Sequence, residues 1–206
     1  FWGSTSDKAI LSALDKVNRQ ELLYDGVWID AGWYGDESDI SIDTYDMSWY
    51  SAAGTWDHIP SLYPNGMKPI SDELVPNGKE FLLWFEPERA MRETDWVEEH
   101  EDYMLFGPGA SFYLYDLSNN EAADYLIDYM DGKIKEYGMT WYRQDFNCEP
   151  YTRWINNDED NRKGMTEINY ITNLYRFLNT LRERNPGLMI DNCASGGKRI
   201  DIEMMK

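Results

Sequence analysis

The chain has 206 residues, with 38 acidic and 19 basic side chains and a formal net charge of −19. A protein of that charge repels the phosphates of nucleic acids and of anionic lipid headgroups, so neither nucleic acid nor membrane is an expected partner. The length is enough for one hydrophobic core, but it falls short of the roughly 250 residues typical of a complete (β/α)8 barrel.

The cysteines and the apolar runs indicate the compartment. Two cysteines are too few for a disulfide scaffold, and no run of roughly eighteen apolar residues is present to cross a bilayer. We therefore expect a reducing, cytoplasmic location. Because the chain opens on Phe1 without an initiator methionine, we also expect its natural N-terminus to lie upstream.

Helical and strand patterns alternate along the chain. In order, the apolar spacing predicts a helix over 5–23, a strand over 27–29, a helix over 67–74, a strand over 80–85, a helix over 94–101, a strand over 112–115, a helix over 121–136, a strand over 139–142, a helix over 168–181 and a strand over 188–190. Residues 36–66 and 148–163 are irregular and aromatic, which is typical of functional loops. The alternation predicts an α/β fold with a mostly parallel sheet.

The carboxyl ends of four predicted strands carry side chains capable of chemistry. They are Asp30, Glu86, Asp145 and Cys193. Because the carboxyl ends of parallel strands share one rim, and α/β folds place their sites there, these side chains are expected to lie together. We interpret residues 1–206 as one domain, a barrel or part of one, with its site on that rim.

Two readings of the acidic residues remain open on this evidence. Asp145 lies two positions after Arg143, so it could form a structural ion pair or cap a turn, or it could be a catalytic carboxylate. Glu86 and Glu88 flank a proline and precede Arg89, so a buried, paired role is at least as well supported as catalysis.

Four segments in order resemble one family, the α-galactosidases or melibiases of glycoside hydrolase family 36, which have a (β/α)8 catalytic domain. IDAGWYG at 29–35 resembles LDDGWFG, and LWFEPERA at 83–90 resembles LWVEPEMV. YRQDFN at 142–147 resembles the nucleophile strand YIKWDMN, and NCASGGKRID at 192–201 resembles ESCSGGGGRFD. Their order and spacing also fit, so the resemblance covers nearly the whole chain.

The resemblance implies a retaining hydrolase that removes terminal α-D-galactosyl residues from α-galactosides, with Asp145 as the nucleophile. It implies no cofactor and no metal, and a carbohydrate substrate as partner. Self-association of the full-length enzyme into a homo-oligomer is left open. The residues that the resemblance places at the substrate are Asp30, Trp33, Trp84, Arg143, Asn147, Cys193 and Gly196.

Retaining hydrolysis also needs a general acid and base. The resemblance places that residue on a strand beyond Lys206. It therefore implies that residues 1–206 are one partial (β/α)8 catalytic domain whose C-terminal strands are missing, and that they are inactive alone. Asp201 matches an aspartate at a loop-to-helix junction, where a helix N-terminal position is a sufficient explanation.

The departures from the family pattern bear on the substrate. Ala31 stands in place of the second aspartate of a pair, Arg143 in place of a lysine, and Ala110 lies nearest to the position of a lost arginine. Arginine and lysine are not equivalent at a tight site. Two alternatives therefore stay open: the same mechanism on another α-linked sugar, such as an α-N-acetylgalactosaminide, or a sugar-binding relative without catalysis.

Overall fold

The computed structural model describes residues 5–37 and 48–205. Its centre is a parallel four-stranded sheet in the order β1-β2-β6-β7. These strands are β1 (Gly26–Ile29), β2 (Glu80–Phe85), β6 (Trp141–Gln144) and β7 (Met189–Asn192). Each one follows a predicted strand to within a few residues, and β2 has the predicted bounds.

The two faces of this sheet differ in exposure because side chains alternate along a strand. Ile29, Leu83, Tyr142 and Ile190 lie side by side in register, and the first three are buried. One position earlier, Trp28 and Met189 lie on the opposite face and are 51% and 52% exposed. The first face packs against helices, and the second is the inner face of the partial barrel.

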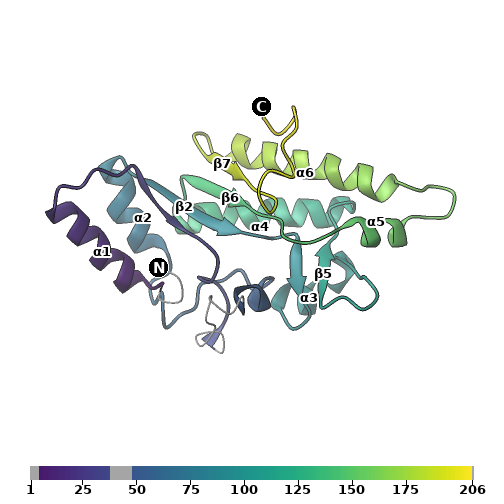
Figure 1. Cartoon of the computed structure of the whole chain (residues 1–206), viewed down its shortest axis with the longest axis horizontal. Coiled ribbons are helices and arrows are strands. Elements are labelled where there is room, and N and C mark those ends of the chain that lie inside the picture. The colour runs from purple at the N-terminus through teal and green to yellow at the C-terminus, as the bar shows by residue number, and fades with distance from the viewer. Residues whose placement is uncertain (1–4, 38–47, 206) are drawn as a thin grey trace.

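Residues 5–37 and 48–205 form six α-helices. They are α1 (Asp7–Arg19), α2 (Lys68–Leu74), α3 (Asp95–Glu99), α4 (Asn120–Tyr137), α5 (Tyr151–Asn157) and α6 (Met165–Arg184). α4 and α6 pack against each other along the sheet, and α1 packs against α2 (Figure 1). Short 3-10 helices add Ser48–Ala52, Val75–Asn77 and Glu101–Tyr103. None of the helices in residues 5–37 and 48–205 is long and apolar enough to cross a membrane.

Helix α4 shows why the sequence folds this way. Its apolar residues recur at helical spacing, and Leu126, Met130 and Ile134 are buried on one face. The Asn119 side chain accepts a hydrogen bond from the backbone N–H of Glu121 at the start. Gly138 ends the helix with φ +66, where a Cβ atom would lie 2.5 Å from Oγ of Ser71. The glycine therefore lets the chain turn directly into β6.

A second sheet was not predicted. β3 (Arg89–Met91), β5 (Phe112–Tyr115) and β4 (Met104–Leu105) form an antiparallel sheet in the order β3-β5-β4. The predicted strand over 112–115 exists, but it belongs to this sheet and not to the parallel one. Strands of two or three residues are too short to give a clear alternation of polar and apolar residues.

The two irregular segments also differ from the prediction. Residues 38–47 of the first lie outside the described ranges, and the rest includes the 3-10 helix Ser48–Ala52. The second contains α5, so treating all of 148–163 as loop was wrong. This short helix is held by packing, since buried Trp154 lies with its ring centroid 5.2 Å from that of Tyr170.

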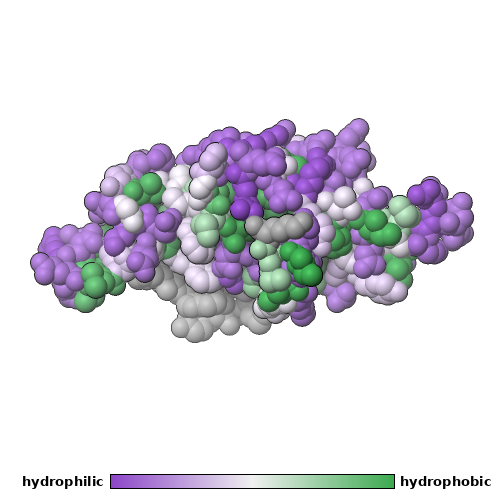
Figure 2. All heavy atoms as spheres, turned by 90° about the horizontal axis from the view of Figure 1, so that it is seen from above, coloured by the Kyte–Doolittle hydropathy of each residue, from purple (hydrophilic) through white to green (hydrophobic). Residues whose placement is uncertain are grey.

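The face of the molecule seen from above is largely hydrophilic (Figure 2). Hydrophilic residues cover most of the face in Figure 2, with apolar residues scattered among them. Ile200, Ile202 and Met205, near the C-terminal end, are exposed.

Candidate active site

The strand register brings the predicted rim residues together. Trp84 of β2 pairs with Arg143 of β6, which pairs with Asp191 of β7. Two residues further along the latter two strands come Asp145 and Cys193, on the same face because side chains alternate. The carboxyl ends of the parallel strands thus form one rim, as the sequence predicted, with Asp145 in its middle.

Hydrogen-bond donors hold the Asp145 carboxylate on both oxygens. Nε1 of Trp84 donates to Oδ2 at 3.0 Å. The backbone N–H groups of Phe146 and Ser195 donate to Oδ1 at 2.7 Å and 3.3 Å. Asp145 is 7% exposed, so these bonds form in a largely water-excluded setting. They fix the carboxylate at the rim of the sheet.

The protonation of Asp145 follows from this setting. Burial alone raises the pKa of Asp145, but side-chain hydrogen bonds from Asn147, Cys193 and Trp84 and the Phe146 N–H outweigh it and hold the pKa below its ordinary value. Asp145 is therefore an ionised carboxylate at neutral pH.

Arg143 has a partner other than Asp145. Its Nη1 lies 2.6 Å from Oδ2 of Asp191, and its guanidinium lies 4.5 Å from the centroid of the Trp28 ring. The Asp191 carboxylate raises the pKa of Arg143 even though burial opposes this. The structural reading of Asp145 as the direct ion-pair partner of Arg143 is therefore not the arrangement found. Arg143 contributes a positive charge beside the carboxylate.

Glu86 is fully buried and paired. It accepts a hydrogen bond from the backbone N–H of Asn147 and forms an ion pair with Arg89. Burial raises the pKa of Glu86 to about 7, although Arg89 and the Asn147 N–H act in the opposite direction. Of the two roles left open by the sequence, this geometry supports the structural one.

Replacing Glu86 by Gln should remove a pH dependence of the free energy of unfolding. Because the pKa of Glu86 rises from 4.5 to about 7 on folding, the folded state holds this proton more tightly. The bound proton stabilises the folded state by about 3 kcal/mol. This stabilisation is complete below the unfolded pKa and is lost as the pH rises through the folded pKa of about 7. Urea denaturation gives the free energy of unfolding at pH 5 and at pH 8. Between these two pH values, it should fall less in Glu86→Gln than in the parent. Equal losses in the two proteins would contradict this.

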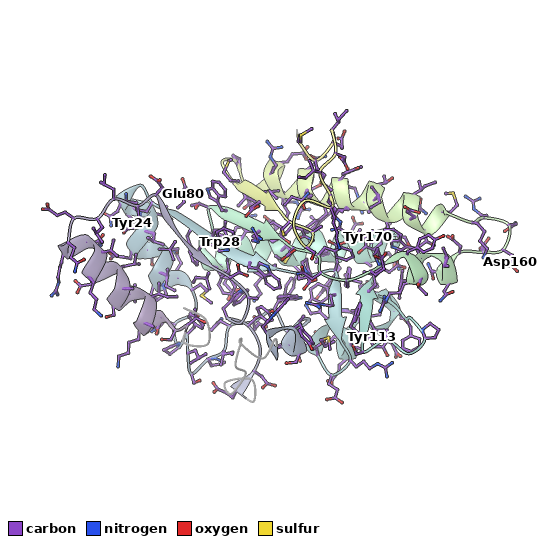
Figure 3. The ribbon with its side chains drawn as sticks, in the orientation of Figure 1. Tyr24, Trp28, Glu80, Tyr113, Asp160 and Tyr170 are labelled. Atoms are coloured by element: carbon purple, nitrogen blue, oxygen red, sulfur yellow. The ribbon has the colours of Figure 1, made fainter. Side chains whose placement is uncertain are left out.

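Glu88, also fully buried, binds four donors. Oε1 accepts from Nε2 of Gln144 and from Nη1 of Arg199, each at 2.6 Å. Oε2 accepts from the Tyr170 hydroxyl at 2.6 Å and from Nη2 of Arg199 at 2.8 Å. Tyr170 lies on α6 and is labelled in Figure 3. Sequence reasoning missed this cluster because its members come from four separate segments, and no spacing along the chain relates them.

Two other predicted substrate residues, Asp30 and Trp33, differ in exposure. Asp30 is exposed, and its Oδ1 accepts from the backbone N–H of Ala31 at 2.8 Å. Trp33 is fully buried, and its Nε1 donates to the backbone oxygen of Trp84 at 2.9 Å. Trp33 therefore supports Trp84, whose side chain is also fully buried, and the substrate role expected for both stays a prediction.

The turn after β7 holds the remaining predicted residues. Cys193 is buried, and its Sγ accepts from the backbone N–H of Gly196 at 3.3 Å. Gly196 is exposed with φ +96, a conformation that glycine adopts without strain. Asp201 is exposed and accepts a hydrogen bond from the Tyr175 hydroxyl at 2.9 Å. Across residues 5–37 and 48–205, no group of His, Cys, Asp and Glu side chains could hold a metal ion.

The sequence pattern of the family described as Melibiase matches residues 7–206 of this chain. The chain belongs to the melibiase family. Among curated relatives, an alpha-galactosidase of Escherichia coli is 31% identical over 185 residues, which are 86% of this chain and 24% of that protein. Alpha-galactosidase AgaA of Geobacillus stearothermophilus is 25% identical, over 90% of this chain and 25% of the relative.

Solved structures show the same fold for this melibiase-family chain. The crystal structure of the GH36 alpha-galactosidase AgaA from Geobacillus stearothermophilus matches with a TM-score of 0.80 and 23% identity, over 98% of this chain and 27% of that one. An alpha-galactosidase from Lactobacillus brevis matches with a TM-score of 0.79 and 22% identity. The chain thus spans about a quarter of the length of these relatives. The expected fold class, a partial α/β barrel, is confirmed.

Proposed function

We propose that the protein that contains this chain is a retaining glycoside hydrolase that cleaves terminal α-D-galactosyl residues from α-galactosides. Asp145 is the nucleophile in this proposal. The observation that carries it is a buried carboxylate directly after β6 that accepts hydrogen bonds from Trp84, Phe146 and Ser195. Burial raises the pKa of this carboxylate, but side-chain hydrogen bonds from Asn147, Cys193 and Trp84 hold it below its ordinary value. Crystal structures of the relative AgaA, in variant forms, hold stachyose or raffinose.

The chemistry asks two things of such a carboxylate. In the first step an oxygen of Asp145 bonds to the anomeric carbon as the glycosidic oxygen leaves with a proton from the general acid. In the second step water gives a proton back to that group, now the base, as its oxygen displaces the carboxylate. A lowered pKa keeps Asp145 ionised for the attack. The same low pKa makes it a good leaving group when water cleaves the glycosyl-enzyme.

The proton donor must be a second carboxyl group, roughly 5 Å from the nucleophile in a retaining enzyme. Glu86 and Glu88 are buried with their partners, and Asp191 is bound to Arg143. The Met204 N–H and the Tyr175 hydroxyl lower the pKa of Asp201, which is the opposite of what an acid needs. We therefore assign the acid and base to none of these four carboxyl groups.

The sugar pocket in this proposal consists of Asp30, Trp84, Arg143, Asn147, Cys193 and Gly196, with Trp33 supporting Trp84 from below. Ala31 offers no acceptor beside Asp30, and Arg143 is oriented by Asp191 and Trp28. These two positions favour, as the second candidate, the same mechanism on another α-linked sugar such as an α-N-acetylgalactosaminide. Hydrolysis rates of the full-length protein on a panel of aryl α-glycosides separate the two, because no preference for galactose would remove the first.

Covalent trapping tests the nucleophile directly. In a 2-fluoro-galactosyl fluoride the 2-fluoro substituent slows both steps and the fluoride leaving group speeds the first, so the glycosyl-enzyme should accumulate on the full-length protein. Peptide mass spectrometry is expected to place the label on Asp145, and an Asp191→Asn variant should still be labelled. A label on another residue, or none under conditions where the aryl galactoside is hydrolysed, would overturn the assignment.

A further inference from the structure

We propose that Arg199 and Glu88 are positioning residues for the nucleophile. Their buried ion pair holds the two backbone N–H groups that donate to Oδ1 of Asp145, those of Phe146 and Ser195. This inference rests on the proposed function, since it assumes that Asp145 attacks the sugar. It assigns a task to two side chains that do not touch the reacting atoms.

The first part of the argument is the rigidity of the ion pair. Nη1 and Nη2 of Arg199 bond Glu88 in a fork, at 2.6 Å and 2.8 Å. The Glu88 side chain is 0% exposed and that of Arg199 is 12% exposed. The Tyr170 hydroxyl and the Gln144 amide occupy the remaining acceptor sites. A planar fork with every acceptor site occupied leaves Arg199 one orientation.

The second part is the contact between Arg199 and the nucleophile strand. The guanidinium of Arg199 lies 3.9 Å from the centroid of the Phe146 ring, a cation–π contact. Phe146 follows Asp145 and donates its N–H to Oδ1, and Gln144, which precedes Asp145, donates its side-chain amide to Glu88. The residues on both sides of the nucleophile are therefore fixed by one cluster.

The third part is the turn that contains Ser195. This residue has φ +48, a left-handed conformation that costs a non-glycine residue free energy and persists only where the surroundings impose it. Four residues later the same turn is anchored by Arg199 on Glu88. That turn positions the Ser195 N–H toward Oδ1 of Asp145. Weakening the bond between Arg199 and Glu88 would therefore also disorder the Ser195 donor.

The Arg199→Lys variant of the full-length protein tests this. Lysine keeps the charge but loses the fork and the planar contact with Phe146. We expect kcat on an aryl α-galactoside to fall roughly 10- to 100-fold, with KM within about threefold of the parent. Losing donors raises the pKa of Asp145, so the acid limb of the pH profile of kcat/KM should move to higher pH.

Arg184→Lys is the matched control, because Arg184 forms a solvent-exposed ion pair with Asp128 on α4. Its kcat, KM and pH profile should equal those of the parent. A folded Arg199→Lys variant with the parent's kcat and acid limb would overturn the positioning role. If Arg199→Lys does not fold, Phe146→Leu decides, since it removes the ring and keeps the ion pair. An unchanged kcat and acid limb in Phe146→Leu would also overturn the role.

The proposed function can fail separately. Asp145→Asn with the parent's turnover would remove the nucleophile assignment and this inference together. If Asp145→Asn is inactive while folded Arg199→Lys is fully active, the nucleophile assignment stands and only the positioning role is wrong.

Discussion

Replacing Asp145 by Asn is expected to lower kcat of the full-length protein on aryl α-galactosides by on the order of 10⁴-fold or more. The amide cannot form the covalent ester with the sugar, so the two-step route is closed. The donors around it aggravate the loss: Trp84, Phe146 and Ser195 all direct N–H groups at this side chain, and an amide has one acceptor oxygen where the carboxylate has two. Steady-state kinetics measure the loss.

A binding measurement and a control variant show whether the loss is in catalysis and not in substrate binding. Calorimetric titration with an intact α-galactoside should show that Asp145→Asn still binds, because the other pocket residues are unchanged. Asp191→Asn changes a carboxylate one strand away, which binds Arg143 and not the sugar in this proposal, and it should lose far less activity. Turnover by Asp145→Asn within tenfold of the parent is the outcome that the mechanism does not allow.

Replacing Glu88 by Ala should lower the free energy of unfolding by roughly 3–5 kcal/mol. The change removes the acceptor for Arg199, Gln144 and Tyr170 at once. The Arg199 guanidinium would then stay buried without its counter-charge. The loss of stability exceeds the net contribution of the ion pair, because the desolvation penalty remains while the attraction is lost.

Asp128→Ala is the matched control for this measurement. Asp128 also pairs with an arginine, Arg184, but their side chains are 70% and 41% exposed. Its removal should cost less than about 1 kcal/mol. Urea denaturation of both variants under one set of conditions gives the comparison. A cost for Glu88→Ala as small as that for Asp128→Ala would mean that the buried cluster contributes no more than a surface ion pair.

The parallel sheet and the rim could be predicted because each depends on short-range signals. After Glu80, β2 is an uninterrupted apolar run, and α4 and α6 repeat apolar residues at helical spacing over many turns. The position of Asp145 at a strand end needs only the strand to be recognised. Its place beside Trp84 and Cys193 then follows from parallel pairing.

The missed features depend on tertiary contacts. The antiparallel sheet of β3, β5 and β4 has strands too short to carry a pattern. Trp33 lies in a motif that resembles a sugar site, yet its ring is fully buried, and a motif does not tell which aromatic side chain turns inward. Glu88 was recognised as an acid that could be paired, but its partners Tyr170 and Arg199 come from segments that only the fold brings together.

The separation in sequence between Glu88 and Arg199, which is 111 residues, bears on the order of folding. Loops of that length close late, because their entropy must be lost before the contact forms. The other distant donors to Asp145 have the same character, since Trp84 and Ser195 are 61 and 50 residues away. Helical structure in α4 and α6 can form locally and early, whereas the surroundings of Asp145 are complete only when the turn after β7 docks. Refolding should therefore restore the helical signal before it restores a competent carboxylate.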